Sequence, residues 1–279
     1  MPSSIGTESI EDGLTRTTGA GVNLAYRVRG SGPAIVLLHG TSANHAVWEP
    51  VAEALAPSAT VIALDQRGHG RSDKPVTGYA GPDFAGDVVT VLDALGIERA
   101  IVGGHSLGGR NAWLVGALHP DRVVGVVNVD YVPYVEPSVL DDLAVRVAGG
   151  HRAFPDVPAI EAYIRDRYRR ILPDAVERRA RWGYTRSEDG NWWPLADPEA
   201  MRQLIDGFRT PWGAEFRAVT APMTSLRGAD SRIVSEAAWQ AALADRPDDR
   251  WVVVPGADHY IPEEYPDIVT AEFERLLAH

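Results

Sequence analysis

A serine stands where an apolar run meets a helical pattern. Ser106 lies in GGHSLGG, residues 103–109, which fits the pattern G-x-S-x-G through Gly104 and Gly108. In this pattern a strand turns sharply into a helix, so neighbours without side chains are needed and the serine hydroxyl is lifted clear of the sheet. A glycine-rich turn with an incidental serine is the alternative. The strand before it and the helix after it favour Ser106 as a nucleophile.

A histidine after the last apolar run is the candidate base. His259 lies in VVVPGADHYIPEEYP, residues 252–266, and follows the serine in chain order. His39 and His105 also stand at strand ends, but they belong to turns beside the nucleophile. A general base must reach the serine hydroxyl, and strand ends at one sheet edge allow this. We therefore predict His259 as the base, and His69 in the loop 65–75 as structural.

Backbone N–H groups near the serine are candidate oxyanion donors. LLHGT, residues 37–41, ends an apolar run with a His-Gly turn, so the N–H of Thr41 can join that of Leu107. Donors of this kind stabilise negative charge that develops only in the transition state.

These groups need a sheet to bring them together. Six short apolar runs alternate with helical patterns, at 34–39, 60–65, 99–104, 123–129, 222–228 and 250–256. Continuous apolar strands separated by helices indicate a parallel sheet that is covered on both faces. An earlier segment, 21–30, reads as an amino-terminal hairpin added antiparallel. The fold class predicted is α/β, with a mostly parallel sheet flanked by helices.

A long insertion interrupts this alternation. Roughly 90 residues separate the runs at 123–129 and 222–228, far more than a simple crossover needs. Segments 138–148 and 160–172 carry apolar residues at helical spacing. We therefore predict a core of 1–132 and 215–279, and a helical cap of 133–214 over the carboxyl edge of the sheet, where such folds bind ligands.

Composition narrows the partners. The net charge of −11 disfavours nucleic acid and anionic membranes, and the chain has no cysteine for disulfides or thiolate metal sites. The acidic segment 1–16 lacks the features of a secretory signal, and no apolar run approaches the roughly 18 residues that span a bilayer. We expect a cytoplasmic protein with a small-molecule substrate. The sequence leaves the oligomeric state open.

Four motifs together carry a family resemblance. LLHGT, DQRGHGRSDKP, GHSLGG and PGADHYIPEEYP, in this order and at these intervals, resemble the α/β-hydrolase superfamily over nearly the whole chain. The resemblance implies the α/β-hydrolase fold and acyl transfer to water, without a metal or organic cofactor. A serine nucleophile excludes the aspartate-dependent chemistry of the epoxide hydrolases and haloalkane dehalogenases.

The acid of the triad departs from the common pattern. Many members place it in G-x-x-D after the strand that follows the cap, but here Ser231 stands three residues after Gly228 and Asp230 comes one position early. Asp130 ends the strand after the nucleophile helix, next to it in a parallel sheet, and can approach the same histidine. We predict Asp130 as the acid, with Asp230 as the alternative; Asp258 adjoins the base and is disfavoured.

A narrower resemblance is to the 2-(acetamidomethylene)succinate hydrolases. It rests on residues 129–150, 160–184 and 227–235, besides the motifs above. It implies a Ser106, His259 and Asp130 triad with Thr41 and Leu107 N–H groups as oxyanion donors. It further implies hydrolysis of an N-acetyl enamide bond in a small dicarboxylate, with the remaining site residues as follows: Arg146, Arg167 and Tyr168 facing the substrate carboxylates, and Ser231 and Tyr260 in support.

Departures from that family keep other functions open. Ala229 and Asp230 stand where the family has glutamate and serine, and Trp192 and Trp193 enter the cap, where they either line the pocket or form cap core. One alternative is a general carboxylesterase or lactonase of the same fold. Another, of a different class, is a hydrolase-fold ligand-binding receptor with negligible turnover.

Overall fold

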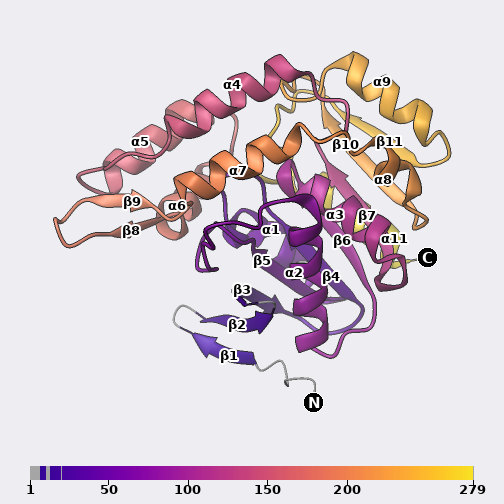
Figure 1. Ribbon diagram of the computed structural model, residues 1–279, viewed down its shortest axis with the longest axis horizontal. Coiled ribbons are helices and arrows are strands. Elements are labelled where there is room, and N and C mark those ends of the chain that lie inside the picture. Colours follow the sequence, from indigo (N-terminus) through magenta and orange to yellow (C-terminus); the bar gives the residue numbers. More distant parts are fainter. Residues whose placement is uncertain (1–6, 11–12, 20, 279) are drawn as a thin grey trace.

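A twisted nine-stranded sheet forms the centre of the described chain. The computed structural model describes residues 7–10, 13–19 and 21–278; parts of the predicted segments 1–16 and 1–132 therefore lie outside it. The predicted mostly parallel α/β sheet is confirmed (Figure 1). No helix in the described part of the chain is both long and apolar enough to cross a bilayer. In spatial order the strands are β1 (Thr7–Ile10), β2 (Leu14–Gly19), β3 (Val22–Arg29), β5 (Thr60–Asp65), β4 (Ala34–Leu38), β6 (Ala100–His105), β7 (Val123–Val129), β10 (Met223–Gly228) and β11 (Arg250–Val254).

The direction of pairing changes once across this sheet. Neighbours from β1 to β5 pair antiparallel, so the predicted amino-terminal hairpin is present as β2 and β3. The strands from β5 to β11 pair parallel, which brings their carboxyl ends to one edge. That edge receives the loops after β4, β6, β7, β10 and β11, and these loops carry every residue predicted for the triad.

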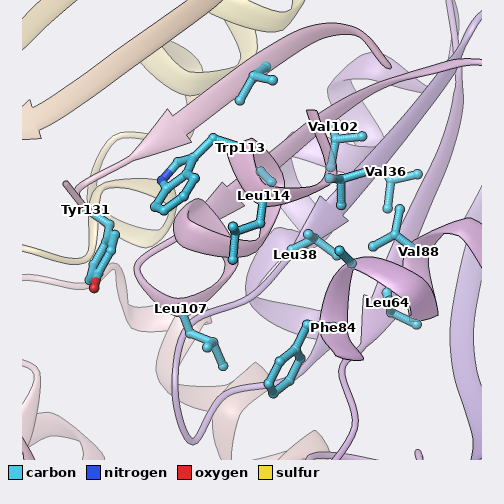
Figure 2. Close-up of a cluster of buried hydrophobic side chains, with 14 of the residues drawn as sticks. Val36, Leu38, Leu64, Phe84, Val88, Val102, Leu107, Trp113, Leu114 and Tyr131 are labelled. Atoms are coloured by element: carbon cyan, nitrogen blue, oxygen red, sulfur yellow. The ribbon is translucent and has the colours of Figure 1, made fainter. Parts of the chain in front are cut away.

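Both faces of the parallel part are covered by helices. In β4, Val36 and Leu38 point into one core cluster and Ile35 and Leu37 into the other, because successive side chains of a strand face opposite ways. Figure 2 shows the first cluster, where Trp113 and its neighbours pack on the strands. The helices α2 (Gly81–Ala94), α3 (Leu107–Leu118), α8 (Gly213–Ala218) and α9 (Glu236–Asp245) bury residues in the first cluster, and α1 (Glu49–Leu55) and α11 (Pro266–Leu277) in the second.

The segment between β7 and β10 forms a layer along one side of the molecule (Figure 1). A third core cluster lies within it, built around Phe154, Ile160, Ile164 and Val176. We propose that this layer is the cap, 133–214, on the core of 1–132 and 215–279. Its elements are α4 (Pro137–Ala148), α5 (Val157–Arg167), α6 (Pro173–Trp182), β8 (Tyr184–Arg186), β9 (Trp192–Pro194) and α7 (Pro198–Phe208).

Two local features of this layer differ from the sequence-based expectation. The helix predicted for 160–172 ends at Arg167, because Tyr168 leaves helical geometry with φ −123° and ψ 72°. Leu172 precedes Pro173, which disfavours helical geometry at Leu172 and starts α6 instead. The hairpin of β8 and β9 was not predicted, since its strands have three residues each and give almost no periodic signal.

Candidate active site

Ser106 occupies the turn between β6 and α3. Its backbone has φ 55° and ψ −114°, a strained geometry for a residue with a side chain. A Cβ on Gly104 would lie 2.0 Å from the carbonyl oxygen of Gly108, and one on Gly108 would lie 2.0 Å from that of Leu38. Only glycine therefore fits on either side of the serine, as the motif predicts. The N–H of Ser106 donates to the carbonyl of Val129 at 2.8 Å, which fixes the turn on the neighbouring strand.

His259 stands in the loop between β11 and the short helix α10 (Ile261–Glu264). Glu264 holds this loop on both sides of the histidine, because its carboxylate accepts from the N–H of Asp258 at 2.8 Å and of Tyr260 at 3.2 Å. Burial, followed by the nearby charge of Arg146, lowers the pKa of His259. The neutral imidazole is the form that can accept a proton. The sequence reasoning missed Glu264, although its spacing of five residues from the histidine is visible in the motif.

Asp130 lies against His259, at the end of β7. Its Oδ2 is 2.6 Å from His259 Nδ1 and accepts from the hydroxyl of Ser231, also at 2.6 Å, while its Oδ1 accepts from the N–H of Gly228 at 2.8 Å. The backbone of Asp130 has φ 53°, which turns the side chain toward β10 and the loop beyond it. Burial raises the pKa of Asp130, and the hydrogen bonds from Ser231 and Gly228 oppose that rise.

The two rival carboxylates point elsewhere. Asp230 forms an exposed ion pair with Arg170 at 2.6 Å, with its side chain half in solvent. Asp258 accepts a hydrogen bond from the backbone N–H of His259 at 2.8 Å, not from its ring. Asp130 is thus the predicted acid that meets the imidazole, and Ser231 holds it.

The other histidines near the site already have partners. His39 Nε2 accepts from the N–H of Gln66 at 3.0 Å, and burial lowers the pKa of His39 to about 4. His105 Nε2 lies 2.7 Å from the carbonyl oxygen of His259 and steadies the same loop. His69 is fully buried, with Nδ1 3.0 Å from the carbonyl oxygen of Arg67. Each of these three rings thus has a nitrogen within hydrogen-bond distance of a backbone group.

Two backbone donors flank Ser106. Leu107 is the first residue of α3, so its N–H has no acceptor one turn earlier in the helix. The turn Gly40 to Ala43 approaches from the other side, because a Cβ on Gly40 would lie 3.4 Å from Cβ of Ser106. Ser42 in this turn has φ 60°. Thr41 belongs to this turn and lines the same small pocket as Ser106, and the N–H groups of Thr41 and Leu107 stay the predicted oxyanion donors.

A small pocket of about 30 Å³ contains Ser106, His259 and Thr41, and we call it the catalytic lobe. Arg146 of α4 reaches it and donates to the hydroxyl of Tyr260 at 2.6 Å. Arg167 donates to the hydroxyl of Tyr168 at 3.2 Å and to the carbonyl of Arg146 at 2.8 Å. The structure thus gathers the predicted cap residues at one pocket. Its complete lining is Gly40, Thr41, Ser42, Ala43, His105, Ser106, Leu143, Arg146, Val147, Arg167, Tyr168, Arg179, Ile233, His259 and Tyr260.

Arg179 of α6 lines the same lobe and was missed by the sequence reasoning. Its guanidinium is buried, binds both carboxylate oxygens of Glu263 in α10, with the Nε contact at 2.7 Å, and lies 4.2 Å from the ring centre of Tyr168. No motif marks Arg179, which stands among four other arginines between 169 and 181. Only its contacts separate it from that group.

A larger pocket of about 370 Å³ adjoins the catalytic lobe, and we call it the outer lobe. The two lobes share Ser42, Ala43, Val147, Arg167, Tyr168 and Arg179, so they form one continuous site. Trp192 packs on the third core cluster and Trp193 lies beside the ring of His151. Among the described residues, neither tryptophan is part of the lining of either lobe.

No metal centre is formed by the described residues, because no three histidine, aspartate or glutamate side chains gather to hold an ion. The chain also offers no thiolate.

Comparison with known proteins places this geometry among hydrolases. Residues 33–160 match the model of the alpha/beta hydrolase fold. The chain is 44% identical over 247 residues to a 2-(acetamidomethylene)succinate hydrolase of Mesorhizobium japonicum, covering 88% of each chain. A crystal structure of E-2-(acetamidomethylene)succinate hydrolase superposes with a TM-score of 0.92 at 42% identity, covering 95% of this chain and 99% of the other. An enol-lactonase from Burkholderia xenovorans shares the fold at a TM-score of 0.75 and 23% identity, covering 95% of this chain and 100% of its own.

Proposed function

Because this chain belongs to the α/β-hydrolase family, together with the 2-(acetamidomethylene)succinate hydrolase of Mesorhizobium japonicum, we propose that it cleaves an amide, enamide or ester bond of a small carboxylated substrate. That it is a hydrolase follows from the family. The bond, the substrate and the roles of its residues are the proposal.

The proposed reaction has two halves. Ser106 Oγ attacks the substrate carbonyl while His259 takes its proton, and the N–H groups of Thr41 and Leu107 stabilise the oxyanion. His259 then protonates the leaving nitrogen or oxygen, which departs and leaves an acyl-serine. Water repeats the sequence on the acyl-serine and releases the acid. Asp130 keeps the proton of the neutral imidazole on Nδ1 and stabilises the imidazolium.

Two arginines of the catalytic lobe have no carboxylate partner among the residues that the structure describes, and this supports an anionic substrate. Arg146 and Arg167 donate to a hydroxyl and to a backbone carbonyl, and within the described part of the chain neither meets a carboxylate. Burying a cation without an anion is costly, whereas a bound carboxylate compensates it and matches the planar guanidinium in two parallel hydrogen bonds. Tyr168 and Tyr260 hold the two arginines at the pocket wall.

The test is acetate release from 2-(acetamidomethylene)succinate, with an uncharged acetate ester in parallel and Ser106→Ala as the blank. We expect serine-dependent turnover of the dicarboxylate. Arg146→Ala should lower kcat/KM for it by about 10- to 100-fold, the value of one hydrogen bond to a charged group, and change the neutral ester much less. Val145→Ala on the same helix, with its side chain 75% exposed, is the matched control.

Two outcomes would favour the rival functions. Turnover of neutral esters alone, indifferent to Arg146→Ala, would indicate a general carboxylesterase or lactonase. Ligand binding without serine-dependent turnover of either compound would indicate a receptor. The cytoplasmic location and the lack of a nucleic-acid partner stay predictions from the sequence.

A further inference from the structure

The outer lobe differs in character from the catalytic lobe. Beyond Arg167 and Arg179, its walls come mainly from apolar side chains of α4, α5 and α7, among them Ala144, Ile164 and Ile205. Its volume of about 370 Å³ lies within the range of pockets that enclose a whole small-molecule ligand. An apolar cavity of about 150 Å³ already binds benzene. This lobe therefore has room for an apolar group of many carbon atoms.

A small dicarboxylate would leave that room unused. Its reacting carbonyl must meet Ser106, and its carboxylates must meet Arg146, Arg167 or Arg179, all of which line the catalytic lobe or the boundary between the lobes. On the walls farther out, which are mainly apolar, Arg202 is the remaining arginine of the described lining, and it is already paired with Glu199 at 2.6 Å and Asp206 at 3.1 Å. A carboxylate buried against these apolar walls would lack a free arginine, and its burial there would be costly. Another part of the substrate is needed to account for them.

The position of the base decides which part this is. His259 must protonate the leaving group, so the leaving group lies on the side of His259, near Tyr260 and Arg146. Among the described residues, His259, Tyr260 and Arg146 line the catalytic lobe but not the outer lobe. The outer lobe opens instead beside Ser42 and Ala43, which follow the oxyanion donor. The substituent on the acyl side of the carbonyl points away from the base and toward this opening.

From these positions we infer that the outer lobe binds the acyl group of the substrate, and that the acyl group preferred is an apolar chain or ring larger than acetyl. This inference rests on the proposed function, since it assigns the two sides of the bond that Ser106 cleaves. The acyl side of the bond then lies in the outer lobe, while the arginines of the catalytic lobe recognise a carboxylate on the leaving side.

The first measurement is kcat/KM for p-nitrophenyl acetate, butyrate and hexanoate, which share one leaving group. Each buried methylene should raise kcat/KM about fourfold, so hexanoate should exceed acetate by on the order of 100-fold. Ala144→Phe, which fills the outer lobe from α4, should lower the hexanoate-to-acetate ratio at least tenfold. Val145→Phe, one residue away on the exposed face of α4, should leave the hexanoate-to-acetate ratio of kcat/KM unchanged.

A second measurement does not depend on turnover. Calorimetry on Ser106→Ala should show hexanoate binding more tightly than acetate by a similar factor, and Ala144→Phe in the same background should remove the difference. Thermal melting of each variant establishes that it is folded.

The outcomes separate the two proposals. Serine-dependent turnover with no gain from acetate to hexanoate, and equal binding of the two acids, would overturn the inference and leave the proposed function standing. Tighter binding of hexanoate without ester turnover would support the outer lobe as an apolar subsite and count against the proposed function.

Discussion

Replacing Asp130 with asparagine changes only which atoms can accept a proton. In the structure Oδ1 accepts from the N–H of Gly228, while Oδ2 accepts from Ser231 and faces His259 Nδ1. An asparagine that keeps its oxygen on Gly228 turns its NH₂ group toward His259. Nδ1 must then accept, so the imidazole proton moves to Nε2, the atom that should accept from Ser106. The base is lost although every heavy atom stays in place.

The size of the effect follows from that change of tautomer. Loss of the correct tautomer in a serine triad lowers kcat about 10⁴-fold, which corresponds to about 5.4 kcal/mol in the barrier. Asp230→Asn is the matched control, because its ion pair with Arg170 is exposed, is screened by water and lies away from the imidazole. Its kcat should stay within about twofold.

The assay is kcat for an acetate ester at pH 7, with thermal melting to establish that both variants are folded. If Asp130→Asn kept kcat within tenfold, or if Asp230→Asn had the larger effect, the acid would be misassigned. Equal losses of kcat in both variants would mean that the two carboxylates act together. That result would also refute the reasoning, because Asp130 contacts His259 and Asp230 contacts Arg170.

Two further predictions concern Ser231 and the buried ion pair. Burial raises the pKa of Asp130 to about 7 and the Ser231 hydroxyl opposes the rise, so Ser231→Ala should raise it further. Because the active form needs an ionised carboxylate and a neutral imidazole, the acid limb of the kcat/KM profile should move to higher pH by up to about 1 unit, and a limb that moves to lower pH would refute this. Glu263→Ala leaves Arg179 buried without its partner and should lower the free energy of unfolding by about 3–5 kcal/mol in urea titration. Asp166→Ala, which removes an exposed pair, should cost less than about 1 kcal/mol, and similar losses in both would contradict the argument.

The sheet and the nucleophile turn could be predicted from the sequence, because both depend on hydrophobic patterns and backbone contacts within short segments. The runs that became β4 to β7 are apolar because both faces of a parallel sheet are buried, and this pattern does not depend on distant residues. Gly104 and Gly108 are required by backbone contacts within one turn and its neighbouring strand. The chain order of Ser106 and His259 then points to one sheet edge.

Other features depended on contacts between distant segments. The end of α5 at Arg167 and the three-residue strands β8 and β9 carry little periodic signal of their own. Arg179 resembles its neighbouring arginines in the sequence and differs only through its pair with Glu263, 84 positions away. Pairing across such a distance is set by how α6 packs on α10.

The sequence by itself determined the fold class, the strand-turn-helix at Ser106 and the candidates for base and acid, because each depends on short-range sterics and hydrophobic periodicity. It left Asp130 and Asp230 as alternatives, since nothing local fixes the direction of either side chain. The tertiary structure decided which of them meets His259, because that contact requires β7, β10 and the loop after β11 to lie side by side. It also decided the outer lobe, because its walls combine helices of the segment 133–214 with Ser42, Ala43 and Asn44 of the distant loop after β4.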